Sequence, residues 1–305
     1  MKITVEQNAH GMKTGEFLKK RLACSSKMIT LLKKDEQGIM LNGKRVTVRE
    51  ILKAGDILEI ADRDTDGDVN PNIVPGGEMP EIIYEDEDII AVNKPPNMPT
   101  HPSHGHYEDT LANALVAYFT GQGTPFVFRS MNRLDRDTSG IVVVSKNRLT
   151  ANLLSKALLD GRVTKQYFAV TDGIPKEKTG RIESDIRRVG ESIIIREALP
   201  AGEGGATARY ALTEYSVVSE KDGRAGVIVT PRTGRTHQIR VHFKYIGTPL
   251  LGDGLYGSPS PLIERHALHA AVLEFPYRGS TLRLTAPPPS NLLSLAGAEV
   301  FDLIF

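Results

Sequence analysis

The sequence predicts an α+β fold, with a mixed, mostly antiparallel sheet as the main body and a small α/β domain before it. Strand-like runs follow one another with few intervening helices after residue 80, and this order favours antiparallel pairing over βαβ units. The first sixty residues instead combine two short amphipathic helices with a hairpin and one further strand. An acidic stretch rich in Pro and Gly separates the two parts.

Residues 1–62 are expected to form the small domain. Ser25 is suited to cap a helix, and Asn42-Gly43 predicts a type I′ hairpin turn, which needs positive φ at both central residues. The expected elements are helices at 15–22 and from 26 to a stop at 37–38, and strands at 39–41, 44–47 and 57–60.

Residues 63–80 read as an acidic linker, and residues 81–305 as the larger domain. In the larger domain, apolar periodicity and turn residues define a regular series of elements. The expected strands are two within 82–92, others at 141–145, 164–170 and 225–230, and meander strands within 182–197 and 206–220, and the expected helices are at 111–118, 149–159 and 236–246.

Charge is unevenly distributed, although the formal net charge of the 305 residues is only +1. Residues 1–60 carry 12 basic and 7 acidic side chains, whereas residues 61–90 carry 1 basic and 10 acidic side chains. Two basic bodies joined by an acidic segment can present polyanion-binding surfaces, although solvated faces show the same pattern. The exposed cations expected on the first helix pair are Lys19, Lys20, Lys27, Lys33 and Lys34.

The single cysteine, Cys24, excludes an internal disulfide and a cysteine-based zinc site. Apolar runs are too short to span a bilayer, and the N-terminus lacks the apolar region of a signal peptide. We therefore expect a cytoplasmic protein without a membrane partner.

Residues 131–140 concentrate charge between two apolar runs. Asp135 and Asp137 lie beside Arg133 and Arg136, and a carboxylate next to a guanidinium stays ionised and can act as nucleophile or base. A polar surface turn with internally paired charges is the alternative from spacing alone. Asp137-Thr-Ser-Gly140 also matches the aspartic protease signature, but such proteases need a second aspartate of the same kind, and the sequence has no second copy.

Two further segments carry polar residues in patterns that suit nucleic-acid binding. In residues 230–244, Arg232 and Arg235 flank Gly234 and a helix start that Thr236 could cap, an arrangement that suits a phosphate. Arg240 follows on that helix. A solvated basic helix is the alternative reading. Tyr167, within a buried strand, is either a core residue or a ring on which a base stacks.

Together these segments resemble the RluA/RluD-type family of RNA pseudouridine synthases over roughly residues 81–290. The first sixty residues resemble, less specifically, the α-L RNA-binding domain named after a ribosomal small-subunit protein. The family's motifs correspond to Arg133-Leu-Asp-Arg-Asp-Thr-Ser-Gly140, Gly234-Arg-Thr-His-Gln-Ile-Arg-Val-His242, Lys165-Gln-Tyr167, Asn93-Lys-Pro95, Gly252-Asp-Gly-Leu-Tyr-Gly257 and Leu268-His-Ala270.

The resemblance implies an isomerase that flips a uridine out of the RNA and rebuilds its glycosidic bond, with no cofactor and no metal. It implies that Asp135 is the catalytic carboxylate, that Tyr167 stacks on the base and that Arg240 keeps Asp135 charged. Attack at C1′, attack at C6 and proton abstraction all remain open. Arg133, Arg136, Arg232, Arg235 and the N-terminal lysines would contact RNA. Large-subunit ribosomal RNA is the first expected substrate and transfer RNA the second, with no obligate protein partner. A catalytically silent RNA-binding or ribosome-assembly factor is the alternative.

Overall fold

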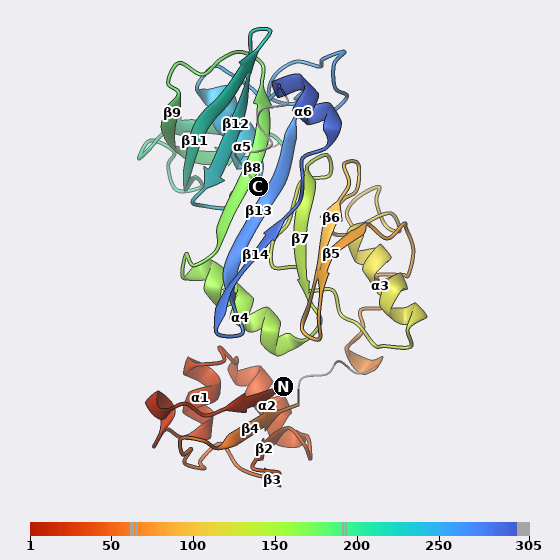
Figure 1. Cartoon of the computed structure of the whole chain (residues 1–305), viewed down its shortest axis with the longest axis vertical. Coiled ribbons are helices and arrows are strands. Elements are labelled where there is room, and N and C mark those ends of the chain that lie inside the picture. Colours follow the sequence, from red (N-terminus) through yellow and green to blue (C-terminus); the bar gives the residue numbers. More distant parts are fainter. Residues whose placement is uncertain (62–63, 65, 191, 193, 298–305) are drawn as a thin grey trace.

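A computed structural model describes residues 1–61, 64, 66–190, 192 and 194–297. Residues 62 and 63, where we expect the domain boundary, and the last eight residues of the chain lie outside the described part. The described residues form a small N-terminal body and a larger body that contains one extended sheet (Figure 1).

The N-terminal body is a four-stranded antiparallel sheet with strand order β1-β4-β2-β3. The predicted hairpin turn is present, with φ of +50° at Asn42 and +76° at Gly43. The Ser25 hydroxyl accepts the Met28 N–H at 3.1 Å and caps the second helix as expected. The elements are β1 (Lys2–Thr4), α1 (Thr14–Lys20), α2 (Ser26–Lys34), β2 (Ile39–Leu41), β3 (Lys44–Arg45) and β4 (Ile57–Ile60), with a 3₁₀ turn at Gln7–Ala9.

The larger body is built on a ten-stranded sheet ordered β10-β9-β11-β12-β8-β13-β7-β6-β5, with β14 paired to β13. The strands are β5 (Glu81–Glu85), β6 (Ile89–Lys94), β7 (Ser139–Ser145), β8 (Thr164–Thr171), β9 (Thr179–Arg188), β10 (Arg196–Pro200), β11 (Arg209–Lys221), β12 (Arg224–Pro231), β13 (Leu268–Tyr277) and β14 (Ser280–Thr285). The helices are α3 (Leu111–Gly121), α4 (Arg148–Leu159), α5 (Gln238–Tyr245) and α6 (Ser290–Ala296), with a 3₁₀ turn at Asp66–Asp68. Nearly all pairs are antiparallel, which confirms the predicted fold class.

Strand β13 lies at the centre of this sheet, between β8 and β7, although it comes from the end of the chain (Figure 1). Its contact with β7 is parallel and pairs Ala270 with Gly140. Gly140 has a φ of +113°, and a Cβ at this position would collide with the Ala270 backbone. A glycine is therefore required where the residue-131–140 loop enters the sheet.

The acidic segment after residue 61 is anchored to the larger body. The buried carboxylate of Asp64 accepts hydrogen bonds from both terminal nitrogens of Arg129, at 2.7 and 2.8 Å. Helix α4 contributes Leu149 and Leu153 to the apolar core of the N-terminal body, so the two bodies share packing. In the described part of the chain, no helix is long and apolar enough to cross a membrane.

Candidate active site

Asp135 lies in the loop that leads into β7, and the backbone on each side of it is fixed. The Thr100 hydroxyl donates to the Leu134 carbonyl at 2.9 Å and accepts the Leu134 N–H at 3.2 Å. On the other side, Lys94 donates to the Arg136 carbonyl at 3.0 Å. These bonds fix the backbone that carries Asp135, whose side chain is 24% exposed.

Lys94 is a fully buried lysine at the end of β6. Its ammonium donates to the carbonyls of Pro95, Met98 and Arg136 at 2.9, 2.7 and 3.0 Å. Burial lowers the pKa of Lys94 to about 7, and nearby Asp137 and Asp135 oppose that shift. Because three acceptors use all three N–H groups, the charged form fits this position, and Lys94 links two loops of the site.

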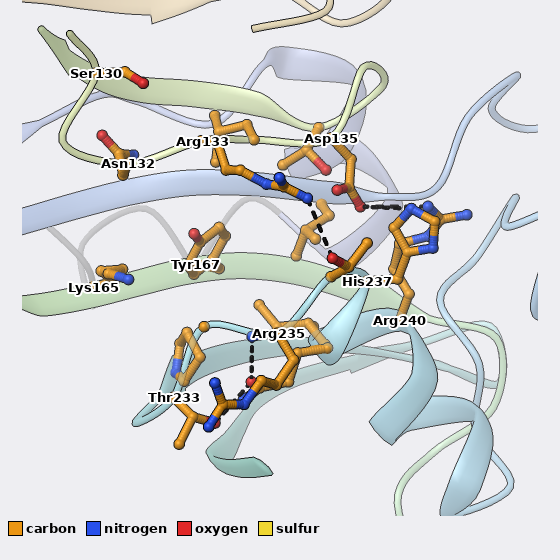
Figure 2. A pocket seen from close by; sticks show the side chains of 18 of the residues that line it. Ser130, Asn132, Arg133, Asp135, Lys165, Tyr167, Thr233, Arg235, His237 and Arg240 are labelled. Atoms are coloured by element: carbon orange, nitrogen blue, oxygen red, sulfur yellow. Dashed lines mark hydrogen bonds and ion pairs between the residues drawn. The ribbon is translucent and has the colours of Figure 1, made fainter. Parts of the chain in front are cut away.

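Arg240, on α5, points one guanidinium nitrogen at Asp135. Its Nη1 lies 3.4 Å from Asp135 Oδ2 (Figure 2). Its other two nitrogens donate to Asp253 at 2.7 and 2.8 Å. Burial acts against the charge of Arg240, but the hydrogen bonds to Asp253 together with the negative charges of Asp253 and Asp135 outweigh it and raise the pKa of Arg240. The guanidinium is therefore a permanent cation held in one orientation.

His237 is a third side chain facing Asp135, with its Nε2 3.8 Å from Asp135 Oδ2. Its Nδ1 lies 2.8 Å from the Tyr256 hydroxyl, which in turn accepts the Arg196 N–H at 3.0 Å. Burial lowers the pKa of His237, although the negative charge of Asp135 works in the opposite direction.

Tyr167 and Asp135 line the same pocket, which has a volume of about 520 Å³. Tyr167 comes from β8 and is buried, and burial together with the charge of Asp135 raises its pKa far above neutrality. Its hydroxyl is therefore protonated at physiological pH. Figure 2 shows Arg133 and Tyr167 on facing walls of this pocket, with Asp135 and Arg240 at one end.

The residues predicted to contact RNA differ in their surroundings. Arg133 donates to the Thr236 hydroxyl at 3.2 Å and, like Arg235, lines the pocket. Arg136 forms an ion pair with Asp137 at 3.1 Å and does not line this pocket. Arg232, the residue after the end of β12, pairs with Glu214 of β11 at 2.7 Å and does not line the pocket. The predicted N-terminal cations are all exposed: Lys19, Lys20, Lys27, Lys33 and Lys34.

The start of α5 differs from the expected cap at Thr236. The N-cap is His237, in a left-handed conformation with φ of +58° and without a side-chain cap. Gln238 stabilises the turn instead, because its Oε1 accepts from the Arg235 N–H at 3.0 Å and from the Thr233 hydroxyl at 2.8 Å. This turn rotates the imidazole of His237 toward Asp135.

Sequence reasoning missed three polar residues around Asp135, namely His237, Asp253 and Tyr256. Asp253 and Tyr256 belong to the Gly252-Asp-Gly-Leu-Tyr-Gly257 motif, which only the family resemblance singles out. The sequence contains both Arg240 and Asp253, but nothing in their spacing showed that the two side chains meet.

The arrangement presents the carboxyl group of Asp135, the fixed guanidinium of Arg240 and the protonated phenol of Tyr167 around a cavity of nucleotide size. Such a set suits nucleophilic or general-base chemistry on a planar, stackable substrate. Among the described residues, no group of three or more His, Cys, Asp or Glu side chains is arranged to hold a metal ion.

Comparisons with known proteins identify the family. Residues 88–245 match the model of the RNA pseudouridylate synthase family. The chain is 35% identical over 280 residues to the uncharacterized RNA pseudouridine synthase YjbO of Bacillus subtilis, covering 91% of this chain and 96% of that protein. It is 34% identical over 237 residues to ribosomal large subunit pseudouridine synthase D of Haemophilus ducreyi, covering 72% of this chain and 71% of that protein.

A solved structure agrees with this assignment. Human RNA pseudouridylate synthase domain containing 1 superposes with a TM-score of 0.59 at 29% identity, covering 72% of this chain and 88% of that one. The matched residues 88–245 include Asp135, Tyr167 and Arg240. The chain therefore belongs to the RNA pseudouridylate synthase family, whose members are isomerases that act on RNA.

Proposed function

We propose that this protein converts a uridine of large-subunit ribosomal RNA to pseudouridine, with Asp135 as the catalytic carboxylate. The observation that carries the proposal is the convergence of Asp135, Arg240 and Tyr167 on one pocket of about 520 Å³. The choice of ribosomal RNA rests on the similarity to the large-subunit enzyme of Haemophilus ducreyi.

The target uridine must leave the base stack to enter this pocket, at a cost of a few kcal/mol. The ring of Tyr167 offers a stacking face for the uracil, and Arg133 lies on the opposite wall (Figure 2). Asp135 then acts on the nucleotide while Arg240 stabilises its negative charge at 3.4 Å.

The isomerisation balances within the nucleotide. The C1′–N1 bond breaks, a C1′–C5 bond forms, C5 loses its proton and N1 gains one. Because Tyr167 stays protonated at neutral pH, it can take part in this transfer only by giving up its own proton as it accepts another. No external group or electron is required by this balance.

The test replaces Asp135 by Asn in a strain that lacks the gene and maps pseudouridine in its ribosomal and transfer RNA. Wild type should restore the missing pseudouridine and Asp135→Asn should not, while RNA binding by the variant stays within a few-fold. Asp137→Asn is the matched control, because Asp137 pairs with Arg136 at the surface. Modification by Asp135→Asn would disprove its catalytic role, and a missing mark in transfer RNA instead of ribosomal RNA would correct the substrate.

A further inference from the structure

Lys165 lies in the same pocket as Asp135 but at a different end. It precedes Tyr167 by two residues on β8, so both side chains project from the same face of the strand. Figure 2 shows Lys165 and Asp135 well separated, with Tyr167 between them. A nucleotide stacked on Tyr167 would therefore have the carboxylate on one side and this ammonium on the other.

No acceptor within the described part of the chain pairs with Lys165 Nζ. Two other lysines with little exposure are paired: the half-buried Lys146 with Glu85, and the fully buried Lys94 with three carbonyls. Burial lowers the pKa of Lys165, because the ammonium loses hydration and no carboxylate compensates. A desolvated cation without a partner is stabilised by an incoming anion.

The pocket is shaped and charged for such an anion. Among the described residues that line it, Asp135 carries the only carboxylate, against the cations of Arg133, Lys165, Arg235 and Arg240. Arg133 and Arg235 donate to neutral oxygens, those of the Thr236 hydroxyl and the Tyr210 carbonyl.

Gly234 lies beside the ammonium of Lys165 in the lining of the pocket. A Cβ at position 234 would lie 3.8 Å from Lys165 Nζ, and apart from its two chain neighbours no other residue would come within 4 Å of it. The glycine therefore leaves open the space directly in front of the ammonium, while its neighbour Arg235 adds positive charge beside it.

We propose that Lys165 binds an RNA phosphodiester next to the target nucleotide, in the space that Gly234 leaves open. The inference rests on the proposed function and adds an anion subsite to it. A phosphate anion offsets the desolvation of an ammonium better than a neutral uracil carbonyl does, because it places a full opposite charge next to the buried cation. Each nucleotide of an RNA strand brings such an anion on both sides.

The experiment uses a synthetic RNA hairpin that contains the uridine found by the pseudouridine map. In separate hairpins, the linkage 5′ or 3′ of that uridine is replaced by an uncharged methylphosphonate. Binding is measured over a salt series in the Asp135→Asn background, so that no turnover occurs. The compared variants are Lys165→Gln and, as a control, Lys176→Gln, which neutralises an exposed lysine outside the pocket.

We expect Lys165→Gln to weaken binding about tenfold and to reduce the slope of log K against log salt by about 0.7 to 0.9, the value for one neutralised phosphate. Lys176→Gln should change neither quantity. One of the two methylphosphonates should weaken binding to the protein with Lys165 by the same factor and cause no further loss with Lys165→Gln. If the loss of binding from Lys165→Gln and the loss from the methylphosphonate multiplied at both linkages, the proposal would be overturned.

Gly234→Ala provides a second measurement if Lys165→Gln folds poorly. The added methyl group should weaken binding of the normal hairpin but not of the hairpin whose critical linkage is uncharged. Equal loss for both hairpins would count against the subsite. If the protein with Asp135 intact makes no pseudouridine in the hairpin, the proposed function fails. If it does make pseudouridine but the binding losses from Lys165→Gln and the methylphosphonates multiply, only the phosphate subsite is refuted.

Discussion

The two carboxylate oxygens of Asp253 accept hydrogen bonds from Nε and Nη2 of Arg240, at 2.7 and 2.8 Å. Asp253 is buried, and its Oδ1 also accepts the N–H groups of Leu255 and Tyr256 at 3.0 and 3.1 Å. This network fixes the plane of the guanidinium and leaves Nη1 for Asp135. Asp253 is therefore a positioning residue that acts through Arg240.

We expect Asp253→Asn to lower kcat about 10- to 100-fold while changing KM less than threefold, because the loss of a supporting carboxylate misplaces Arg240. The variant should also unfold more easily, by about 3 kcal/mol, since it leaves a buried guanidinium without its anion. Single-turnover pseudouridine formation and urea unfolding measure the two effects. Asp137→Asn is the control, and a wild-type kcat in Asp253→Asn would show that Arg240 needs no such support.

We predict the tautomer of His237 from the hydrogen bonds of Tyr256. The Tyr256 hydroxyl accepts the Arg196 N–H, and we expect it to donate its single proton to Nδ1 of His237. Nε2 then carries the imidazole proton and faces Asp135. Tyr256→Phe should release this constraint and lower kcat about three- to tenfold with little change in KM.

Nitrogen NMR of labelled histidine distinguishes the two tautomers directly. In the wild-type protein at neutral pH, His237 should show the Nε2–H form, and in Tyr256→Phe a mixture of both forms. A wild-type spectrum with the proton on Nδ1 would rule out this hydrogen-bond direction.

Acid should destabilise the fold through buried histidines. Burial lowers the pKa values of His242, His266 and His269 to about 4. Well above pH 6.5 each histidine is neutral in both the folded and the unfolded state. Between pH 6.5 and 4 the unfolded chain binds more protons, so the free energy of unfolding decreases as the pH is lowered. The loss is complete below pH 4 and amounts to roughly 3 kcal/mol for each histidine.

His269→Gln tests this in one position. His269 Nε2 donates to the Ala286 carbonyl at 3.0 Å and Nδ1 accepts the Ser139 hydroxyl at 2.9 Å, so protonation would remove an acceptor. The variant should lose less stability than wild type between pH 7 and pH 5 in urea unfolding. Equal losses in both proteins would mean that this imidazole does not control the acid sensitivity.

The exposed lysines of the N-terminal body should contribute to RNA affinity through phosphates. Deleting the body would uncover Leu149 and Leu153 of α4, so charge neutralisation is the cleaner change. Replacing Lys19, Lys27, Lys33 and Lys34 by Gln should lower the salt slope of RNA binding by about 0.7 to 0.9 for each phosphate that these lysines neutralise. The same four changes to Arg should preserve the slope, and an unchanged slope with Gln would exclude this docking role.

Local features of the fold could be predicted because they depend on neighbouring residues. The Asn42-Gly43 turn, the Ser25 cap and the buried strand β7 all follow from short patterns. The three-residue strand β1 gave no such pattern, because Lys2–Thr4 alternates too briefly to be distinguished from a loop.

Non-local relationships around the site were harder to predict. The motifs placed Asp135, Tyr167 and Arg240 in one pocket only through resemblance, since 105 residues separate Asp135 from Arg240. The pairing of Arg232 with Glu214 depends on the register of β11 and β12, which the sequence pattern did not determine. The start of α5 also depended on tertiary structure, because Gln238 reaches the Leu212 carbonyl on β11 at 2.9 Å.

The central place of β13 has a consequence for how the enzyme is made. Asp135 precedes β7 on one side of this strand, whereas Tyr167 and Arg240 belong to elements on the other side. On the ribosome, the nascent chain contains every proposed catalytic group before residues 268–277 emerge, yet the sheet that joins them is incomplete. Catalytic competence should therefore appear late and abruptly during synthesis, when a strand from the end of the chain inserts between two halves already present.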